Sequence, residues 1–327
     1  MLNPMLAPIH DRAALVAAAR ETIAQGSQSF AAASRVFAPT TRERAWLLYA
    51  WCRAADDMTD GQDLGHSGRV SENPLAAQAR LERLTRAAID GAGPVPLPFE
   101  ALRCVVKETG IPRHFLEDHL AGFALDATGW RPQSEADLLR YCYHVAGSVG
   151  CMMAVVMGVA PEDNDTLDRA CDLGLALQLA NIARDIVPDA EVGRCYLPAR
   201  WLAEEGIEEQ DLLEPIHRPA LARMATRLVT LARRYRQSAR VGAARLPLRS
   251  RLAVLAADGI YGAIGEKVAA LSERAWDERV RVSRAGKLGQ LLIATGRSLG
   301  HASSASRDGL WTRPRHLYEL PALRSRA

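Results

Sequence analysis

Four aspartates in two motifs have the residue type and the spacing that bind a divalent cation. One motif spans Asp56 to Asp60 and the other Asp185 to Asp189, and each places two carboxylates four residues apart. Residues at this spacing lie on the same face of a helix. Like charges so placed destabilise an isolated helix by roughly a few tenths of a kcal/mol, and burial increases the cost unless a cation neutralises them. The pattern therefore predicts a positive ion between the two motifs.

The ligand type narrows the choice of cation. Carboxylates without His or Cys beside them favour Mg²⁺ or Mn²⁺, whereas zinc prefers imidazole or thiolate. Mg²⁺ is commonly held by one or two carboxylates together with phosphate oxygens, so the motifs predict a phosphate or diphosphate substrate. One such motif alone is typical of a solvent-exposed helix face. Two of them, each beside an arginine (Arg53 and Arg184), favour a site.

Each motif continues a polar stripe along its helix. Tyr49, Arg53 and Asp56 precede Asp60 at spacings of four, three and four. An aromatic ring, a cation and two acids therefore share one helical face.

The second stripe crosses a strongly apolar segment, where Gln178, Asn181 and Asp185 follow a three-then-four spacing. A buried polar group without a partner costs about 1–3 kcal/mol, so such a stripe indicates a satisfied network or a ligand site. Pro188 is expected to end this helix near Asp189.

These residues belong to a longer series of motifs that occurs in a known family. The series comprises Ser27-Gln28-Ser29-Phe30, Tyr49-x-x-x-Arg53-x-x-Asp56-x-x-x-Asp60, Tyr141-x-Tyr143-x-Val145-Ala146-Gly147-x-Val149-Gly150, Gln178-x-x-Asn181-x-x-Arg184-Asp185-x-x-x-Asp189 and Tyr196-Leu197-Pro198. In this order, from about residue 20 to about residue 290, the chain resembles the squalene and phytoene synthase family. Each motif alone is weak evidence, and the set is specific.

The resemblance implies an all-α isoprenoid-synthase fold, a single domain with a central apolar cavity that binds two prenyl diphosphates. It implies catalytic roles for Asp56, Asp60, Asp185, Asp189 and Tyr49, with Asp56, Asp60, Asn181, Asp185 and Asp189 as ligands of Mg²⁺ or Mn²⁺. It implies a substrate-binding set of Ser29, Phe30, Arg53, Tyr141, Val145, Val149, Gly150, Leu177, Gln178, Asn181, Arg184, Tyr196, Tyr261 and Arg279.

The implied reaction joins two geranylgeranyl diphosphates head to head, through prephytoene diphosphate, to 15-cis-phytoene and diphosphate in carotenoid biosynthesis. Squalene or dehydrosqualene synthesis from farnesyl diphosphate is the alternative within the family. No Gly-x-Gly-x-x-Gly turn follows a strand pattern, and NADPH is not expected. An alternative of another class is a non-catalytic scaffold related to the family, which loss of the acidic positions would have supported. A third class, an RNA- or membrane-binding module, would depend on the basic C-terminus.

The segments that position these residues show a helical pattern throughout the chain, and no alternating strand pattern competes with it. The expected helices are 11–25, 41–60, 74–89, 99–109, 112–126, 134–157, 161–186, 219–241, 247–272 and 287–303. They predict one catalytic domain over residues 1–303 and a basic tail over 304–327, expected to be solvent-exposed. The glycine-rich stretch from Gly61 to Asn73 is either a mobile flap or an ordinary surface loop.

Composition limits partners and location. The 41 Lys and Arg nearly balance the 38 Asp and Glu, and the basic tail offers few aromatic rings, Trp311 and Tyr318, for stacking with bases, so nucleic acid is not an expected partner. Six cysteines without CxxC spacing indicate reduced thiols of a cytoplasmic protein. The start of the chain lacks a signal-peptide pattern, and the longest apolar stretch falls short of the ~20 residues that span a bilayer. Peripheral membrane contact and handover of the product to a carotenoid desaturase are compatible with a lipophilic substrate.

Overall fold

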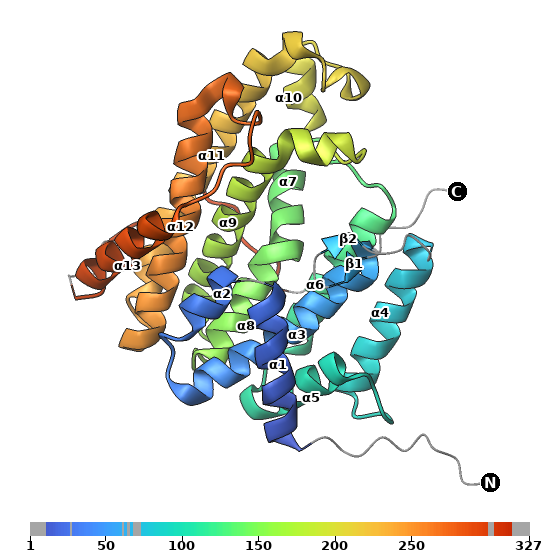
Figure 1. Ribbon diagram of the computed structural model, residues 1–327, viewed down its shortest axis with the longest axis vertical. Coiled ribbons are helices and arrows are strands. Elements are labelled where there is room, and N and C mark those ends of the chain that lie inside the picture. Colours follow the sequence, from blue (N-terminus) through green and yellow to red (C-terminus); the bar gives the residue numbers. More distant parts are fainter. Residues whose placement is uncertain are drawn as a thin grey trace.

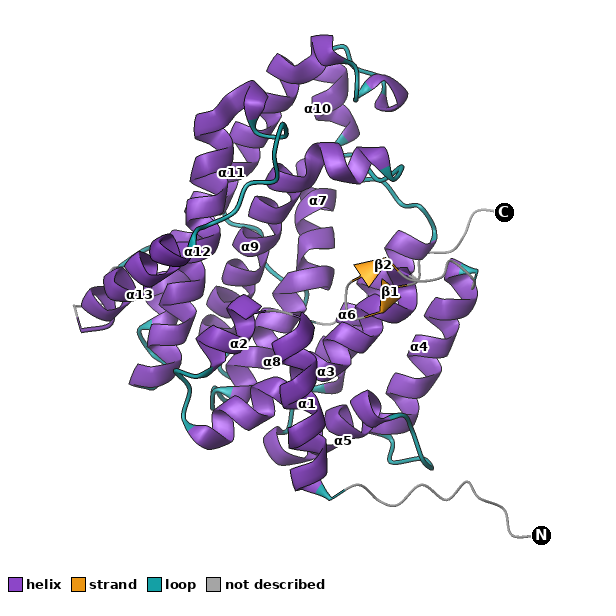
Figure 2. Ribbon diagram, viewed as in Figure 1, coloured by secondary structure: helices purple, strands orange, loops and turns teal. Residues whose placement is uncertain are grey.

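Helices make up nearly all of the regular structure in the computed structural model, which describes residues 11–26, 28–60, 62–63, 66–67, 73–299 and 304–315 (Figures 1 and 2). The helices are α1 (Arg12–Gly26), α2 (Gln28–Ser34), α3 (Pro39–Asp60), α4 (Pro74–Ile89), α5 (Leu97–Thr109), α6 (Arg113–Ala127), α7 (Glu135–Cys142), α8 (Ser148–Val156), α9 (Asn164–Glu191), α10 (Ala199–Glu204), α11 (Arg218–Ala243), α12 (Leu248–Leu271) and α13 (Arg284–Leu299). Two-residue strands, β1 (Gln62–Asp63) and β2 (His66–Ser67), pair antiparallel just after α3. The all-α expectation is confirmed, and most of the flap region lies outside the described residues.

Helix α9 is the central element, and α8, α11 and α12 pack along it (Figure 1). One hydrophobic core runs from α1 to the residues after α13, with Trp51, Leu175 and Trp201 almost completely buried. A single core of this extent fits one helical domain. Within the described residues, no helix is long and apolar enough to cross a membrane.

The predicted helix over 134–157 forms with a local irregularity. Ser134 and Asp137 form a capping box at the start of α7, and a π-helical turn, Tyr143–Gly147, joins α7 to α8. Beside this turn the backbone lies very close to α9, because a Cβ added to Gly174 would lie 2.3 Å from the Ala146 carbonyl oxygen. Gly174 is therefore needed for close packing, and this packing sets the position of the apolar side chains that follow Tyr143.

The expectation that Pro188 ends the second acidic helix near Asp189 is confirmed in part. The helix is interrupted three residues before Pro188, at Asp185, whose φ of −105° and ψ of 15° are not helical, and a further helical segment that contains Pro188 runs to Glu191. A proline ring clashes with the carbonyl four residues before it and lacks an N–H donor. The kink at Asp185 makes Pro188 part of the first turn of a new helical segment, where proline is tolerated.

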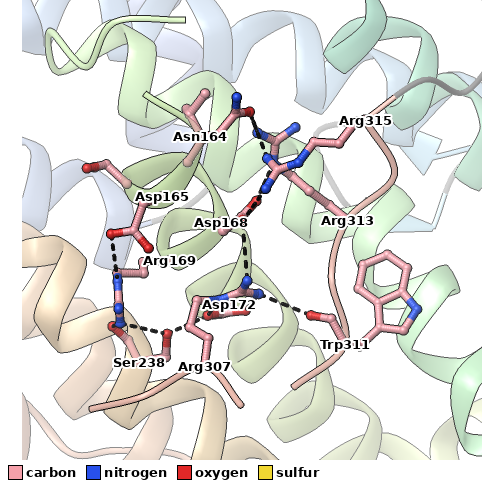
Figure 3. A network of polar contacts seen from close by, with 12 residues as sticks. Asn164, Asp165, Asp168, Arg169, Asp172, Ser238, Arg307, Trp311, Arg313 and Arg315 are labelled. Atoms are coloured by element: carbon pink, nitrogen blue, oxygen red, sulfur yellow. Dashed lines mark hydrogen bonds and ion pairs between the residues drawn. The ribbon is translucent and has the colours of Figure 1, made fainter. Parts of the chain in front are cut away.

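The expectation of a solvent-exposed tail holds for only half of residues 304–315, where exposed residues alternate with partly buried ones and Arg313 is buried. This stretch, which we call the strap, packs against the N-terminal half of α9, and Arg313 within it is only 4% exposed. The reason is ion pairing, since arginines of the strap meet buried carboxylates of α9 (Figure 3). The residues from 316 onward, including Arg324 and Arg326, lie outside the described part of the chain, and the domain boundary after residue 303 stays a prediction.

Candidate active site

An apolar cavity of about 430 Å³ lies among α2, α3, α8, α9, α11 and α12. Eleven residues singled out in the sequence line it: Phe30, Tyr49, Asp56, Val145, Ala146, Val149, Gly150, Leu177, Gln178, Asn181 and Tyr261. A few polar groups at one end of a mostly apolar cavity are typical of a small-molecule site. Among the polar residues of the lining, Asp56, Gln178 and Asn181 come from the acidic-motif stretches of α3 and α9, and we call this end of the cavity the acidic end. Asp185 and Asp189 follow Asn181 on α9 but do not line the cavity.

The first acidic motif is organised by Arg53. Its guanidinium lies 2.6 Å from an oxygen of Asp57 and 4.0 Å from one of Asp56, and the Asp56 side chain is 45% exposed. Tyr49 stacks with Phe30 at a centroid distance of 6.0 Å, and burial raises its pKa to about 12. Tyr49 therefore stays a neutral phenol at physiological pH.

Two predicted residues of this region are only partly described. The side chains of Ser29 and Asp60 lie outside the described structure, although the backbones of both are helical. The sequence analysis did not single out Asp57, because the four-residue spacing that identified the motif passes over it. Its pairing with Arg53 is a further i,i+4 contact on α3.

In the second acidic motif, two arginines contact the same carboxylate, that of Asp185. Arg184 donates to both oxygens of Asp185, through Nε at 2.9 Å, and Arg279 approaches from after α12 at 3.5 Å. Asp189 lies one turn further, and burial, followed by the negative charge of Asp185, raises its pKa to about 7. This carboxyl is therefore poorly neutralised by its protein neighbours, which fits a position that a cation occupies.

Tyr141 and Tyr196 lie beside the second motif rather than in the cavity lining. Both hydroxyls donate to Asp126 at 3.1 Å, and the two rings stack at a centroid distance of 4.8 Å. The charge of Asp126 also raises the pKa of Asp189, so the two carboxylates interact electrostatically. Asp126 was missed as a site residue, because one acid at the end of an amphipathic helix carries no spacing signal.

The oxygen-only donors fit a hard divalent cation, although no cluster is fully assembled. Among the described residues, no three His, Cys, Asp or Glu side chains are close enough together to hold a metal ion. Asp56, Asp185 and Asp189 nevertheless offer the carboxylates that Mg²⁺ and Mn²⁺ prefer, and Asn181 adds an amide oxygen on the cavity wall. The raised pKa of Asp189 is the feature that a bound cation would reverse.

A helical fold with an apolar cavity, acidic motifs at one end and arginines beside them defines a class of enzyme that handles diphosphate esters of apolar chains. The match to a family model narrows this class. Residues 23–286 match the model described as squalene/phytoene synthase, and the chain belongs to that family. Members of the family depend on a divalent metal in general.

Similar proteins of known function cover almost the whole chain. A protein of Pantoea ananas named 15-cis-phytoene synthase is 46% identical over 92% of this chain and 96% of its own length. Proteins of the same name from Enterobacter agglomerans and a Paracoccus species are 49% and 46% identical, over 88% and 92% of this chain and 99% of their own lengths.

Solved structures agree on the fold. A dehydrosqualene synthase structure with a bound ligand superposes with a TM-score of 0.77 at 26% identity, covering 89% of this chain and 98% of that one. A squalene synthase, HpnC, from Alicyclobacillus acidocaldarius gives a TM-score of 0.70 at 21% identity, over 81% and 95% of the two chains. The second likeness concerns the fold alone.

Proposed function

We propose that this protein is a phytoene synthase, a prenyltransferase that condenses two geranylgeranyl diphosphates head to head, through prephytoene diphosphate, to 15-cis-phytoene in carotenoid biosynthesis. The observation that carries the proposal is identity of 46–49% to three 15-cis-phytoene synthases along nearly the whole chain. The cavity with its acidic end provides a compatible site.

Asp56, Asp60, Asp185 and Asp189, with Asn181, would hold the divalent cation, Mg²⁺ or Mn²⁺. When bound, the cation neutralises the charge that develops on a departing diphosphate. Arginine side chains would also stabilise the negative charge of the diphosphate. Arg53 and Arg184 are mostly buried, whereas Arg279 is 59% exposed at the rim. Guanidinium groups bind phosphate oxygens in a bidentate manner, so these three arginines orient the two diphosphates.

The wall of the cavity has the composition that a carbocation requires. Val145, Val149, Gly150 and Leu177 present apolar surface without nucleophilic groups, which excludes water from the reacting carbons. The rings of Phe30, Tyr49 and Tyr261 line the same space, and aromatic rings stabilise positive charge through their quadrupoles. Because the Tyr49 phenol stays protonated, it does not compete as a nucleophile.

Dehydrosqualene synthesis from farnesyl diphosphate is the second candidate, and the observation that favours it is the TM-score of 0.77 to a dehydrosqualene synthase. The deciding experiment incubates purified protein with either diphosphate, with and without Mg²⁺, Mn²⁺ and NADPH, and identifies the extracted hydrocarbon. Metal-dependent phytoene from geranylgeranyl diphosphate, unaffected by NADPH, supports the proposal. A thirty-carbon product from farnesyl diphosphate alone supports the second candidate. Absence of turnover in folded protein supports a non-catalytic scaffold.

We also propose that the protein is cytoplasmic, contacts the bilayer peripherally and passes its product to a carotenoid desaturase. The six cysteines are free, as in reducing compartments. On α13, Leu288, Leu292 and Ile293 are 59%, 66% and 47% exposed, and arginines and a lysine flank them. An exposed apolar face with basic flanks is typical of an interfacial helix. Flotation with anionic vesicles tests this contact, and Leu292→Glu is expected to reduce it, whereas Thr295→Glu on the same helix tests charge alone.

A further inference from the structure

The end of the cavity far from the acidic motifs has a charged residue in its wall. Arg169 of α9 lines the cavity together with Thr166 and Ala170, twelve residues before Asn181. At 1.5 Å per residue, about 18 Å of helix separates Arg169 from Asn181 at the acidic end. A prenyl tail that starts at the acidic end therefore points toward Arg169.

Arg169 is held in one position by contacts from three segments. Its Nη1 donates to the Ser238 hydroxyl at 3.2 Å and to the Ala305 carbonyl of the strap at 3.2 Å, and its Nε lies 3.4 Å from Asp165 (Figure 3). Only 10% of the side chain is exposed. With the guanidinium fixed by these contacts, the aliphatic stem is the part of Arg169 that is available to the apolar cavity.

The stem is also fixed from the side of α11. A Cβ added to Gly242, which lines the same end of the cavity, would lie 2.6 Å from the Cβ of Arg169. The stem therefore packs directly against the backbone of α11. Arg169 and Gly242 together form the end wall, and neither has room to move toward the other.

The strap supports the wall through a second, buried set of contacts. Arg307 of the strap binds both oxygens of Asp172 at 2.8 and 2.9 Å, and Ser238 donates to Asp172 at 2.5 Å (Figure 3). Ser238 and Asp172 are fully buried. Arg307 thus positions Asp172, Asp172 positions Ser238, and Ser238 positions the Arg169 guanidinium.

We infer that Arg169 is a specificity-determining residue whose stem, fixed by Ser238 and the strap, limits the length of the prenyl tail that the cavity accepts. The inference rests on the proposed function, because it assumes a prenyl diphosphate with its head at the acidic end. Discrimination of one methylene in an apolar pocket is worth about 10–200-fold in kcat/KM. One isoprene unit is larger than a methylene, so the end wall is sufficient to select between adjacent chain lengths.

The test measures kcat/KM for farnesyl, geranylgeranyl and farnesylgeranyl diphosphates, which differ by one five-carbon unit each. Arg169→Ala removes the stem from the end wall and so deepens the cavity. It is expected to raise the ratio of kcat/KM for farnesylgeranyl over geranylgeranyl diphosphate at least about tenfold. Arg169→Met keeps an unbranched apolar stem but loses the contacts that fix it, so its ratio is expected to lie between those of wild type and Arg169→Ala. Arg245→Ala is the matched control, since Arg245 bonds Thr166 and pairs with Asp165 nearby but does not line the cavity.

A second variant acts in the opposite direction and keeps the inference testable if Arg169→Ala does not fold. In Gly242→Ala, the new methyl group or the displaced stem occupies the end of the cavity, so the ratio for farnesyl over geranylgeranyl diphosphate is expected to rise. Thermal unfolding of each variant establishes that it is folded. Unchanged ratios in folded Arg169→Ala or Gly242→Ala would overturn the inference. Failure of the wild-type protein to use any of the three substrates would instead overturn the proposed function.

Discussion

The two ends of the cavity both combine aspartates with arginines. They differ in how deeply the carboxylates are buried and in how completely arginines pair with them. At the acidic end, the Asp56 side chain is 45% exposed and the pKa of the Asp189 carboxyl rises to about 7. At the end beside Arg169, where the strap packs and which we call the strapped end, Asp168 and Asp172 are 6% and 0% exposed and meet three arginines. Burial raises the pKa of Asp172 as well, so the two ends differ in exposure and in pairing with arginine rather than in the direction of the pKa shift. Partly exposed carboxylates can accept a cation that arrives with substrate, whereas buried carboxylates paired with arginines fix a structure. The same residue types therefore fit the proposed cation site at one end and structural support at the other.

The largest expected effect comes from removing charge at the acidic end. Asp185→Asn is expected to lower kcat for phytoene formation by about 10³-fold or more, because several kcal/mol of charge stabilisation for the departing diphosphate is lost. The helical content should change little, and the melting temperature should fall less than in a variant of the fully buried Asp172, because the Asp185 side chain is 16% exposed. Asp90→Asn, an acid at the end of α4 whose side chain is 49% exposed and which does not line the cavity, is the control and should leave kcat unchanged. Equal activity losses in both variants would mean that the loss does not depend on the position of Asp185.

Removing charge at the strapped end should affect stability instead of chemistry. Asp172→Asn leaves Arg307 buried beside a neutral group, and breaking one side of a buried ion pair costs about 3–5 kcal/mol. For a chain of this size the melting temperature should fall by roughly 10 °C. Calorimetry measures the loss, and activity assayed well below the melting temperature should stay within about threefold of wild type. A loss of activity as deep as that of Asp185→Asn, without a change in melting temperature, would show that this end also takes part in the chemistry.

The sequence predicted the two ends unequally, for a physical reason. The motifs at the acidic end are local, since Tyr49, Arg53 and Asp56 are set on one face by helical spacing alone. The contacts of the strapped end are not local, because Arg307 and Asp172 are 135 positions apart and no periodicity connects them. For the same reason, Asp126 was missed although it binds both Tyr141 and Tyr196.

Backbone detail was the other part that the sequence pattern did not contain. The helices were predicted to within a few residues, with α2 and α10 missed because each is short. The π-helical turn at Tyr143–Gly147 depends on close packing against α9, which a helical period does not report. The kink at Asp185 follows from Pro188, but the helical period does not show that the helix resumes after it. Both irregularities lie beside the predicted site.

Two buried histidines, on α6 and in the π-helical turn, give an intermediate effect that depends on pH. His119 and His144 are buried, and burial lowers both pKa values to about 4, from an ordinary value of 6.5. Between pH 6.5 and pH 4 the unfolded chain binds more protons than the folded protein, so each histidine makes stability fall as pH falls. From pH 7.5 to pH 5, the expected contribution of each is a loss of about 2 kcal/mol.

A variant comparison isolates this contribution from neighbouring groups. Asp118 accepts a hydrogen bond from the Tyr143 hydroxyl, and burial raises the pKa of its carboxyl to about 7. Because the folded protein then binds this proton more readily than the unfolded chain, Asp118 makes stability rise as pH falls over the same range. The charge of Arg140 adds to the lowering of the His144 pKa. His119→Asn keeps a donor for the His144 carbonyl and removes the titration. Chemical denaturation at pH 7.5 and pH 5 should show that the variant loses about 2 kcal/mol less than wild type. An identical loss in both would mean that His119 titrates normally.

The smallest effect should come from an ion pair on the outer surface, where neither burial nor substrate is involved. Arg233 of α11 and Glu266 of α12 form a bidentate pair in which both side chains are nearly half exposed. Exposed pairs contribute about 0–1 kcal/mol, because water screens the charges and ordering two long side chains costs entropy. Glu266→Gln should therefore change the free energy of unfolding by less than about 1 kcal/mol and leave kcat unchanged. A cost comparable to that of Asp172→Asn would mean that pairing geometry, rather than burial, separates the strapped end from the rest of the molecule.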